Sequence, residues 1–282
     1  MKAEGRDLSL FASDEPCAAA AVFTRSRFPG APVLVGRELM RSGVLQAVVV
    51  NSRVSNVGTG AEGVDRARRM GAAAARELGI PPERVLVSST GVIAVPLPID
   101  RIEAGLAGLS AELQHDPLVG AQGMMTTDTR PKAVSLSFPA HRGEAVLTAV
   151  GKGSGMIAPD MATMLVYLFT DAALEAPALD RHLRAVVSRT FNMLSVDGDT
   201  STSDTCALLA NGRAGSVSGE AFRDALERVC EVMTEMLARD GEGATRLLRV
   251  RVVGAADDGE ARMVARSLVN SPLVKTMVHG GD

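Results

Sequence analysis

The residues with the greatest chemical potential lie in a glycine-rich stretch near the middle of the chain. Residues 151–169 read GKGSGMIAPDMATMLVYLF, so Lys152 stands among three glycines and Ala162-Thr163 opens an apolar run. Glycines let the backbone approach another group closely, and Lys152 would add a positive charge there. The spacing differs from the phosphate-binding motif G-x-x-x-x-G-K-[ST], because two of the glycines follow the lysine and no helical pattern comes after it. Composition alone favours a tight turn that leads into a core strand.

A threonine and a glycine at the end of a predicted strand form a second candidate. Residues 88–93 read SSTGVI, with Thr90 and Gly91 shortly after the apolar run RVLV. Adjacent backbone N–H groups at such a position can point into a cavity and stabilise an oxyanion. A turn that ends the strand explains the same residues, and the sequence alone favours that interpretation.

Acidic and hydroxyl residues are concentrated between Ser195 and Thr205, which read SVDGDTSTSDT. The run is faintly similar to a calcium-binding loop. With Asp197 as its first position, however, Thr202 replaces the sixth-position glycine and Leu208 replaces the twelfth-position glutamate. The hydroxyls could instead line a polar pocket, and a solvated turn rich in serine and threonine is favoured on composition.

Two further segments place polar residues in unusual surroundings. Residues 240–245 read DGEGAT, and a helix C-cap with Gly241 at the C′ position explains that glycine but not the embedded Glu242. Residues 124–132 read MMTTDTRPK and fit either a pocket wall or a loop. The four histidines are scattered without ligand spacing, so we expect no metal site.

Composition narrows the class of protein that could use these residues. The chain has 282 residues, 46% of them hydrophobic and 22% charged, which is typical of a folded globular protein. A net charge of −3 and an aromatic content of 3% argue against a nucleic-acid-binding surface. Three cysteines without a C-x-x-C spacing favour a reducing compartment over a disulfide framework. Because no signal peptide and no apolar run of roughly 20 residues is present, we expect a soluble cytoplasmic protein.

Strand and helix patterns are mixed along the whole chain, which predicts one α+β domain of layered sheets and helices. Apolar runs predict strands, and apolar residues at helical spacing predict helices. The expected strands are residues 17–23, 32–35, 46–50, 84–90, 132–138, 144–150, 163–171, 206–212 and 246–254. The expected helices are residues 61–78, with Gly79 as the stop signal, 100–114, 178–194, 219–239 and 258–270.

Together these segments resemble a known family, the ornithine acetyltransferases, also called glutamate N-acetyltransferases, of arginine biosynthesis. The resemblance covers residues 7–282 and is especially close to the branch found in clavulanic-acid gene clusters. Several long motifs in the family's order are highly specific. They are VFTRSRF (22–28), STGVI (89–93), MTTDTRPK (125–132), GMIAPDMAT (155–163), the 195–205 run, DGEGA (240–244) and NSPLVKT (270–276).

The resemblance implies a protein that is made as one inactive chain and cuts itself between Ala162 and Thr163. Residues 1–162 would become an α-chain and residues 163–282 a β-chain, both parts of one intertwined domain. A threonine hydroxyl is a weak nucleophile by itself, but an N-terminal threonine carries its own α-amine as a general base. Thr163 would then hold the acetyl group as an ester on its Oγ.

The implied reaction is a ping-pong transfer of acetyl from N-acetylornithine to glutamate, which yields ornithine and N-acetylglutamate. In this resemblance Thr90 and Gly91 match the family's oxyanion site. No cofactor is implied, and acetyl-CoA could serve as an alternative acetyl donor.

The family's substrate-binding positions are matched by Lys152, Glu242 and Thr163 and by a threonine in residues 125–127. We prefer Thr126 for that position, with Thr127 next. By charge, Lys152 suits a substrate carboxylate and Glu242 suits an amino group.

The implied fold is a layered α-β-β-α-type sandwich of the α/β class. It resembles the N-terminal-nucleophile hydrolases without sharing their topology. The implied assembly is an α2β2 heterotetramer that acts on small molecules and has no nucleic-acid or membrane partner.

The sequence departs from the family at its end. The family continues past K-T-x-x-H-G-x-D with a Pro-Asn-Trp-Gly-Arg motif and a segment that supplies an Asn and a terminal Thr to the substrate pocket, whereas this sequence stops at Asp282. We therefore expect a C-terminally truncated β-chain. Two alternatives stay open: a self-processing amidase or aminopeptidase in which water resolves the acyl-enzyme, and an inactive homologue that folds and binds small amino acids.

Overall fold

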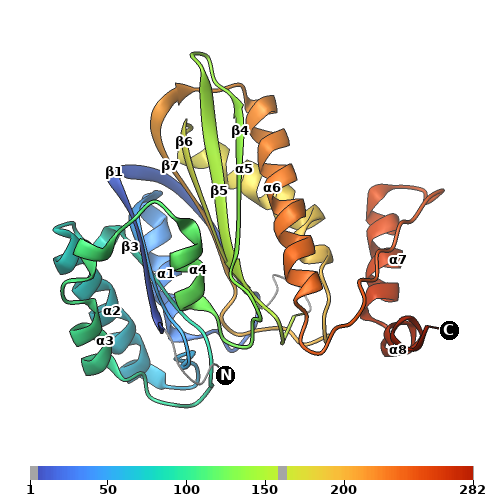
Figure 1. Cartoon of the computed structure of the whole chain (residues 1–282), viewed down its shortest axis with the longest axis horizontal. Helices are drawn as coiled ribbons and strands as arrows, with labels where there is room; N and C mark the ends of the chain where they lie inside the picture. Colours follow the sequence, from blue (N-terminus) through green and yellow to red (C-terminus); the bar gives the residue numbers. More distant parts are fainter. Residues whose placement is uncertain (1–5, 158–163, 282) are drawn as a thin grey trace.

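The computed structural model describes residues 6–157 and 164–281, which form a seven-stranded sheet flanked by helices (Figure 1). The strand order across the sheet is β3-β2-β1-β7-β6-β5-β4. The pairs β2–β3 and β6–β7 are parallel, and the other neighbours are antiparallel. The strands are β1 (Leu8–Phe23), β2 (Val44–Asn51), β3 (Val85–Ser89), β4 (Lys132–Pro139), β5 (Glu144–Lys152), β6 (Leu165–Ala173) and β7 (Thr205–Ser216).

Strand β1 joins two halves of this sheet. It is 16 residues long, and its register shifts between Ala12 and Cys17. Its first part pairs mainly with β2 and its second part with β7. An irregularity of this kind bends a strand and increases its twist. As a result Tyr167 of β6 lies in the same buried cluster as Val48 of β2 and Leu86 of β3, although β6 is far from β2 and β3 in the strand order of the sheet.

Helices cover the outer faces of both halves. The first half packs against α1 (Ala31–Leu39), α2 (Gly60–Leu78) and α3 (Ile99–Leu106). The second half packs against α5 (Ala176–Arg189) and α6 (Gly219–Arg239). Helix α4 (Pro117–Met124) lies between the halves and adds Met124 to their shared cluster. The expected α/β class is therefore confirmed, and its two inner layers are halves of one continuous sheet.

Two further helices, α7 (Asp258–Asn270) and α8 (Pro272–Gly280), lie beside α6 and apart from the sheet (Figure 1). Neither helix has a buried residue. Apolar side chains such as Met263 and Leu273 are largely exposed. No helix of the described ranges is long and apolar enough to cross a bilayer.

Most of the predicted elements are confirmed, with differences at their ends. Helices α6 and α7 have the predicted bounds. Helix α2 starts one residue earlier than predicted, and the predicted stop residue Gly79, with a φ of +66°, caps its C-terminus. The β4–β5 hairpin turns through Gly143 at φ +81°. Strand β6 is buried for most of its length, as its continuous apolar run predicts.

Two of the predicted strands are wrong. Residues 32–35 belong to α1, because Pro32 fits the first turn of a helix and a short apolar run does not distinguish a strand from a buried helix. Residues 246–254 form no strand, because they pair with neither edge strand of the sheet, β3 or β4, and run beside α6 instead.

The predicted helix at 100–114 is interrupted, because α3 ends at Leu106 and Gly108 has a φ of +82°. The predicted helix at 178–194 starts two residues earlier as α5, ends at Arg189 and is followed by a short 3-10 turn. Helices α4 and α8 were not predicted.

Candidate active site

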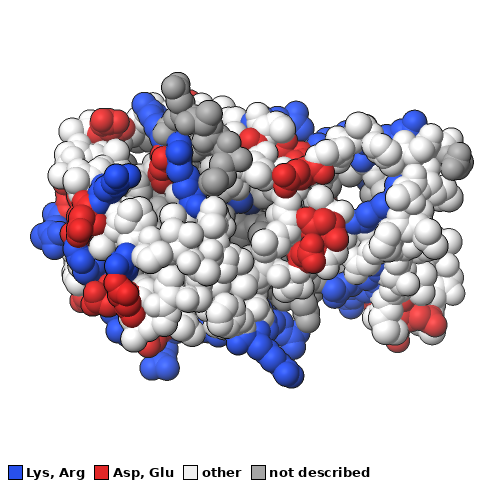
Figure 2. Space-filling view, turned by 90° about the horizontal axis from the view of Figure 1, so that it is seen from below, with Lys and Arg blue, Asp and Glu red and all other residues white. Residues whose placement is uncertain are grey.

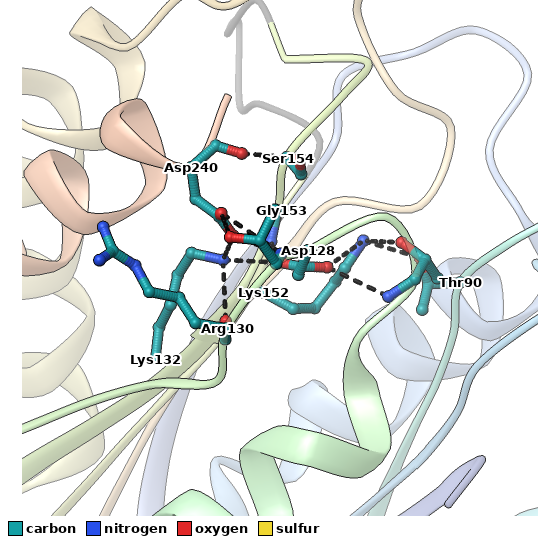
Figure 3. Close-up of polar contacts among 10 residues, drawn as sticks. Thr90, Asp128, Arg130, Lys132, Lys152, Gly153, Ser154 and Asp240 are labelled. Carbon is teal, nitrogen blue, oxygen red and sulfur yellow. Dashed lines mark hydrogen bonds and ion pairs between the residues drawn. The ribbon is translucent and has the colours of Figure 1, made fainter. Parts of the chain in front are cut away.

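Lys152 lies at the carboxyl end of β5 and points into the interior (Figure 3). Its side chain is 5% exposed. Its Nζ donates hydrogen bonds to Thr126 Oγ1 at 2.9 Å and to Thr90 Oγ1 at 3.3 Å. Thr90 directly follows β3, and Thr126 follows α4. The structure thus brings together three of the predicted site residues from distant parts of the sequence.

A buried ion network supports this cluster. The Lys132 side chain is fully buried, and its Nζ lies 2.7 Å from Asp128 Oδ1 and 2.5 Å from Asp240 Oδ2. Asp128 Oδ1 also accepts the Gly153 N–H at 2.6 Å, and Asp128 Oδ2 lies 3.8 Å from Lys152 Nζ. The sequence did not single out Asp128 and Asp240, whose only signal was their position inside the family motifs. Lys132 had one further, weak signal, because it is one of only four lysines in the chain.

Burial and nearby charges shift the pKa values of Asp128 and Lys152. Burial alone would raise the pKa of Asp128, but the nearby Lys152 and Lys132 ammonium groups outweigh it and hold the pKa below its usual value. Burial lowers the pKa of Lys152, and Asp128 opposes that shift. Asp128 is therefore an ionised counter-charge shared by two buried lysines.

The Thr90–Gly91 pair offers one hydroxyl and one backbone N–H. The Thr90 N–H donates to Asn51 O at 3.0 Å, so it is not one of the two free N–H groups expected from the sequence. The Thr90 hydroxyl and the Gly91 N–H remain as donors. Gly91 has a φ of +128°, and a Cβ at this position would lie 2.1 Å from the carbonyl carbon of Arg53. Only glycine fits here.

The hydroxyl-rich 195–205 run holds the chain on both sides of the predicted cleavage point. Asp197 accepts the Ile157 N–H at 2.8 Å, and Asp204 Oδ1 accepts the Met164 N–H at 2.9 Å. In the ranges that the structure covers, no group of acidic, histidine or cysteine residues could hold a metal ion. Asp197 and Asp204 of this run thus accept hydrogen bonds from backbone N–H groups.

Asp204 is buried to an extent that is unusual for an acid. The residue is 1% exposed, and its Oδ2 has no hydrogen-bond partner among the described residues. Burial raises the pKa of its carboxyl well above the usual range. The sequence singled out the run that contains it but not this residue.

Ala162 and Thr163 lie outside the described residues. Met164 is the first described residue after them, and the next residue, Leu165, pairs with Lys152 in the β5–β6 register. Chain connectivity therefore ties the predicted nucleophile to the strand that lies beside Lys152. The role of Thr163 stays a prediction.

Glu242 lies against the glycine-rich stretch. Its backbone N–H donates to Ser154 O at 2.8 Å, and a Cβ at Gly155 would lie 2.2 Å from Glu242 Oε2. Residues 154–155 of the glycine-rich stretch and the 240–244 motif therefore lie in direct contact. Thr127 is exposed, in contrast to the partly buried Thr126, so the structure favours Thr126 as the member of the cluster.

A large hollow separates the body of the molecule from α7 and α8 (Figure 2). Its volume is about 960 Å³, and it is lined by α6, residues 242–250, α7 and α8. Among the described residues of the predicted site, Glu242 lines it, whereas Thr90, Thr126 and Lys152 do not. The Lys152 cluster therefore lies outside this hollow.

Comparison with known proteins gives a consistent result. The profile of the ArgJ family matches residues 1–282. The arginine biosynthesis bifunctional protein ArgJ of Rhodococcoides fascians is 46% identical over 280 residues, which are 99% of this chain and 68% of the relative. Glutamate N-acetyltransferase Oat2 of Streptomyces clavuligerus is also 46% identical, over 99% of this chain and 70% of the relative.

Solved structures agree with the sequence relatives. The crystal structure of the arginine biosynthesis bifunctional protein ArgJ from Bacillus halodurans has a TM-score of 0.53 and 34% sequence identity, over 56% of this chain and 84% of that chain. The family resemblance expected from the motifs is thereby confirmed. Because the family profile matches the whole chain and these relatives are 46% identical to it, the chain belongs to the ArgJ family.

Proposed function

We propose that this chain is a self-processing N-terminal-threonine enzyme that transfers acetyl from N-acetylornithine to glutamate. The names of its relatives, which include a glutamate N-acetyltransferase, support this assignment. The observation that carries it is the convergence of Thr90, Thr126 and Lys152 beside the start of β6, two residues after Thr163. Donors for an oxyanion and a positive charge therefore lie next to β6, the strand that begins two residues after Thr163.

Self-processing would create the catalyst. Water adds across the Ala162–Thr163 peptide bond, which leaves a carboxylate on Ala162 and a free α-amine on Thr163. Residues 1–162 and 163–282 become two chains that share one sheet, since β1–β5 precede the cut and β6–β7 follow it. The carboxylates of Asp197 and Asp204 accept hydrogen bonds from the backbone N–H groups of Ile157 and Met164 and so hold these residues in place.

Acetyl transfer would proceed in two balanced steps. The Thr163 amine takes the hydroxyl proton while Oγ attacks the acetyl carbon, the amide bond breaks, and the proton passes to the departing ornithine amine. Glutamate then attacks the acetyl ester through its amine, regenerates the Thr163 hydroxyl and leaves as N-acetylglutamate. The Thr90 hydroxyl and the Gly91 N–H would stabilise the oxyanion in both steps.

The surrounding charges match amino-acid substrates. Lys152 supplies a positive charge that favours a carboxylate, and Glu242, beside Gly155, supplies a negative charge that favours an amino group. Thr126, and next to it Thr127, would add hydroxyl contacts. The reaction as written needs no cofactor, and the processed chains would assemble as an α2β2 heterotetramer.

The first test is the intact mass of the purified protein under denaturing conditions. We expect two fragments, residues 1–162 and 163–282, in the wild type and in Thr163→Ser, and one uncut chain in Thr163→Ala. Acetyl transfer is then followed with isotope-labelled N-acetylornithine, with acetyl-CoA as a second donor. Release of labelled acetate without glutamate dependence would indicate an amidase instead, and an uncut wild type would contradict the proposal.

A further inference from the structure

We propose that Asp204 is the proton donor of the self-processing step and protonates the nitrogen of Thr163 as the Ala162–Thr163 peptide bond breaks. This inference rests on the proposed self-processing and deepens it, because it names a group that moves a proton in that step. It comes from the position of the Asp204 carboxyl and from the oxygen of that carboxyl that has no partner among the described residues.

Asp204 lies in the middle of the sheet, where the end of β1 meets the starts of β6 and β7. Its backbone carbonyl accepts the Thr24 N–H at 2.9 Å, and its carboxyl Oδ1 accepts the Met164 N–H at 2.9 Å. The next residue, Thr205, donates its own N–H to Met164 O at 3.1 Å. Both polar backbone groups of Met164 are therefore bound, and this residue is fixed against the start of β7.

Covalent geometry keeps the scissile nitrogen close to this carboxyl. Three bonds join Met164 N to the nitrogen of Thr163, so the two atoms are at most about 4 Å apart. Asp204 Oδ1 lies 2.9 Å from the same Met164 nitrogen. Thr163 itself lies outside the described residues. A carboxyl that is bound at one end of this three-bond path can nevertheless reach the atom at the other end with its second oxygen.

The second oxygen of the carboxyl is available for such a contact. Asp204 is 1% exposed, and its Oδ2 has no hydrogen-bond partner within residues 6–157 and 164–281. Buried polar atoms are rarely left in this condition, and a catalytic role is one of the few explanations for an exception. An asparagine would accept the Met164 N–H without placing an ionisable group in the interior, so that hydrogen bond alone does not explain the acid.

Burial favours the protonated form of this carboxyl, because it raises the pKa of Asp204 well above the usual range. The Lys152 charge and the Ser201 hydroxyl also face the carboxyl, and both oppose the shift of this pKa without cancelling it. Since Oδ1 accepts the Met164 N–H, the proton belongs on Oδ2. The oxygen without a partner is therefore the one that carries the proton.

The step balances with this carboxyl as its proton carrier. Thr163 Oγ attacks the carbonyl carbon of Ala162, the C–N bond breaks, and the electron pair of that bond goes to the Thr163 nitrogen. Asp204 gives its proton to this nitrogen and receives the hydroxyl proton of Thr163 in return. The products are an ester, a neutral amine and the regenerated carboxyl, and water then hydrolyses the ester to release residues 1–162.

The test follows self-cleavage of the whole chain over time. Each variant is made by cell-free translation with a short pulse of labelled methionine, transferred to buffers from acidic to alkaline pH, and sampled on denaturing gels. Asp204→Asn keeps an acceptor for the Met164 N–H and removes the transferable proton, whereas Asp204→Ala removes both. The matched control is Asp197→Asn, because Asp197 accepts the Ile157 N–H on the other side of the cut but is exposed.

We expect Asp204→Asn to lower the rate of self-cleavage about 100- to 10,000-fold, which is the usual contribution of a positioned proton donor. Asp204→Ala should be at least as slow. Asp197→Asn should lose far less, because its amide oxygen replaces the lost acceptor. The wild-type rate should fall as pH rises through the pKa of Asp204, since the donor then loses its proton, and Asp204→Asn should lack this fall.

Other outcomes would overturn the inference. If Asp204→Asn cuts itself at the wild-type rate, the carboxyl serves only as an acceptor, and the proposed function still stands. Cleavage at the wild-type rate with slow acetyl transfer would place the role of Asp204 after the cut, which also contradicts the inference. A wild type that cuts itself but does not transfer acetyl refutes the proposed transfer and leaves the comparison of the variants valid. An uncut wild type refutes both.

Folding of the variants is measured separately. Circular dichroism and the melting temperature show whether each uncut chain has the wild-type fold. A folded Asp204→Asn chain that stays uncut supports the inference. If Asp204→Asn does not fold, the pH dependence of the wild-type rate decides: a fall with rising pH supports the inference, and a flat or rising profile overturns it.

Discussion

Replacing Lys132 with methionine should destabilise the fold strongly, because it removes the cation from a fully buried ion network. Lys132 bridges Asp128 and Asp240 at 2.7 and 2.5 Å, and the side chains of all three are at most 3% exposed. Methionine keeps most of the aliphatic volume, so the main effect is electrostatic. Removing one partner of a buried pair costs about 3–5 kcal/mol, since it leaves an uncompensated buried charge.

That free energy is a large part of the about 5–15 kcal/mol that stabilises a typical fold. For a chain of this size we expect the melting temperature to fall by about 6–20 °C, taking about 2–4 °C per kcal/mol. Differential scanning calorimetry and urea unfolding followed by circular dichroism would both measure the change. The matched control is Lys275→Met, whose ammonium donates to Ser195 Oγ and Val196 O. It should cost about 1 kcal/mol.

A compensating substitution tests the physical cause. Lys132→Met/Asp240→Asn removes one of the two stranded carboxylates, so it should be more stable than Lys132→Met alone. The reasoning is refuted if Lys132→Met costs no more than Lys275→Met. It is also refuted if Asp240→Asn makes the Lys132→Met variant less stable.

Two further substitutions test local features of the site. Burial raises the pKa of Asp204 in the folded state, so the stability that this residue contributes is present at low pH and is lost as pH rises through the folded pKa. Asp204→Asn keeps an acceptor for the Met164 N–H but has no proton to lose. The melting temperature of this variant minus that of the wild type should therefore rise between about pH 4 and about pH 8. A difference that does not change with pH would contradict a raised pKa of Asp204. Gly91→Ala should lower the urea midpoint of unfolding more than Gly143→Ala does. Both glycines have a positive φ, so about 1–3 kcal/mol of backbone strain is common to the two variants, but only at Gly91 would the added Cβ overlap with backbone, at Arg53. Equal unfolding midpoints for the two variants would refute this overlap.

Local patterns in the sequence were sufficient for most of the fold. Helix α6 and the β4–β5 hairpin follow from apolar spacing and turn residues over a few neighbouring positions. The errors occurred where tertiary contacts decide the outcome. Residues 32–35 carry too short an apolar run to specify a strand. Residues 246–254 alternate like a strand but pair with neither edge strand of the sheet, β3 or β4.

The candidate site was predictable only in part. The motifs nominated Thr90, Thr126, Lys152 and Glu242, since unusual glycines and hydroxyls mark such positions in the sequence. The roles of Asp128 and Asp240 were not predictable, because an isolated acid in a polar run gives no sign of its partner. Lys132 and Asp240 are 108 positions apart, and only the packing of α6 on β4 brings them into contact.

The sequence by itself determined the family, the α/β class and the segments that carry the chemistry. These depend on residue types and short spacings, which are fixed by covalent order. The tertiary structure alone decided which groups form ion pairs and hydrogen bonds with one another. Lys152 and Thr90 are 62 positions apart and meet because β3 and β5 face each other across the buried cluster of the bent sheet. This contact is set by long-range packing that no local pattern encodes.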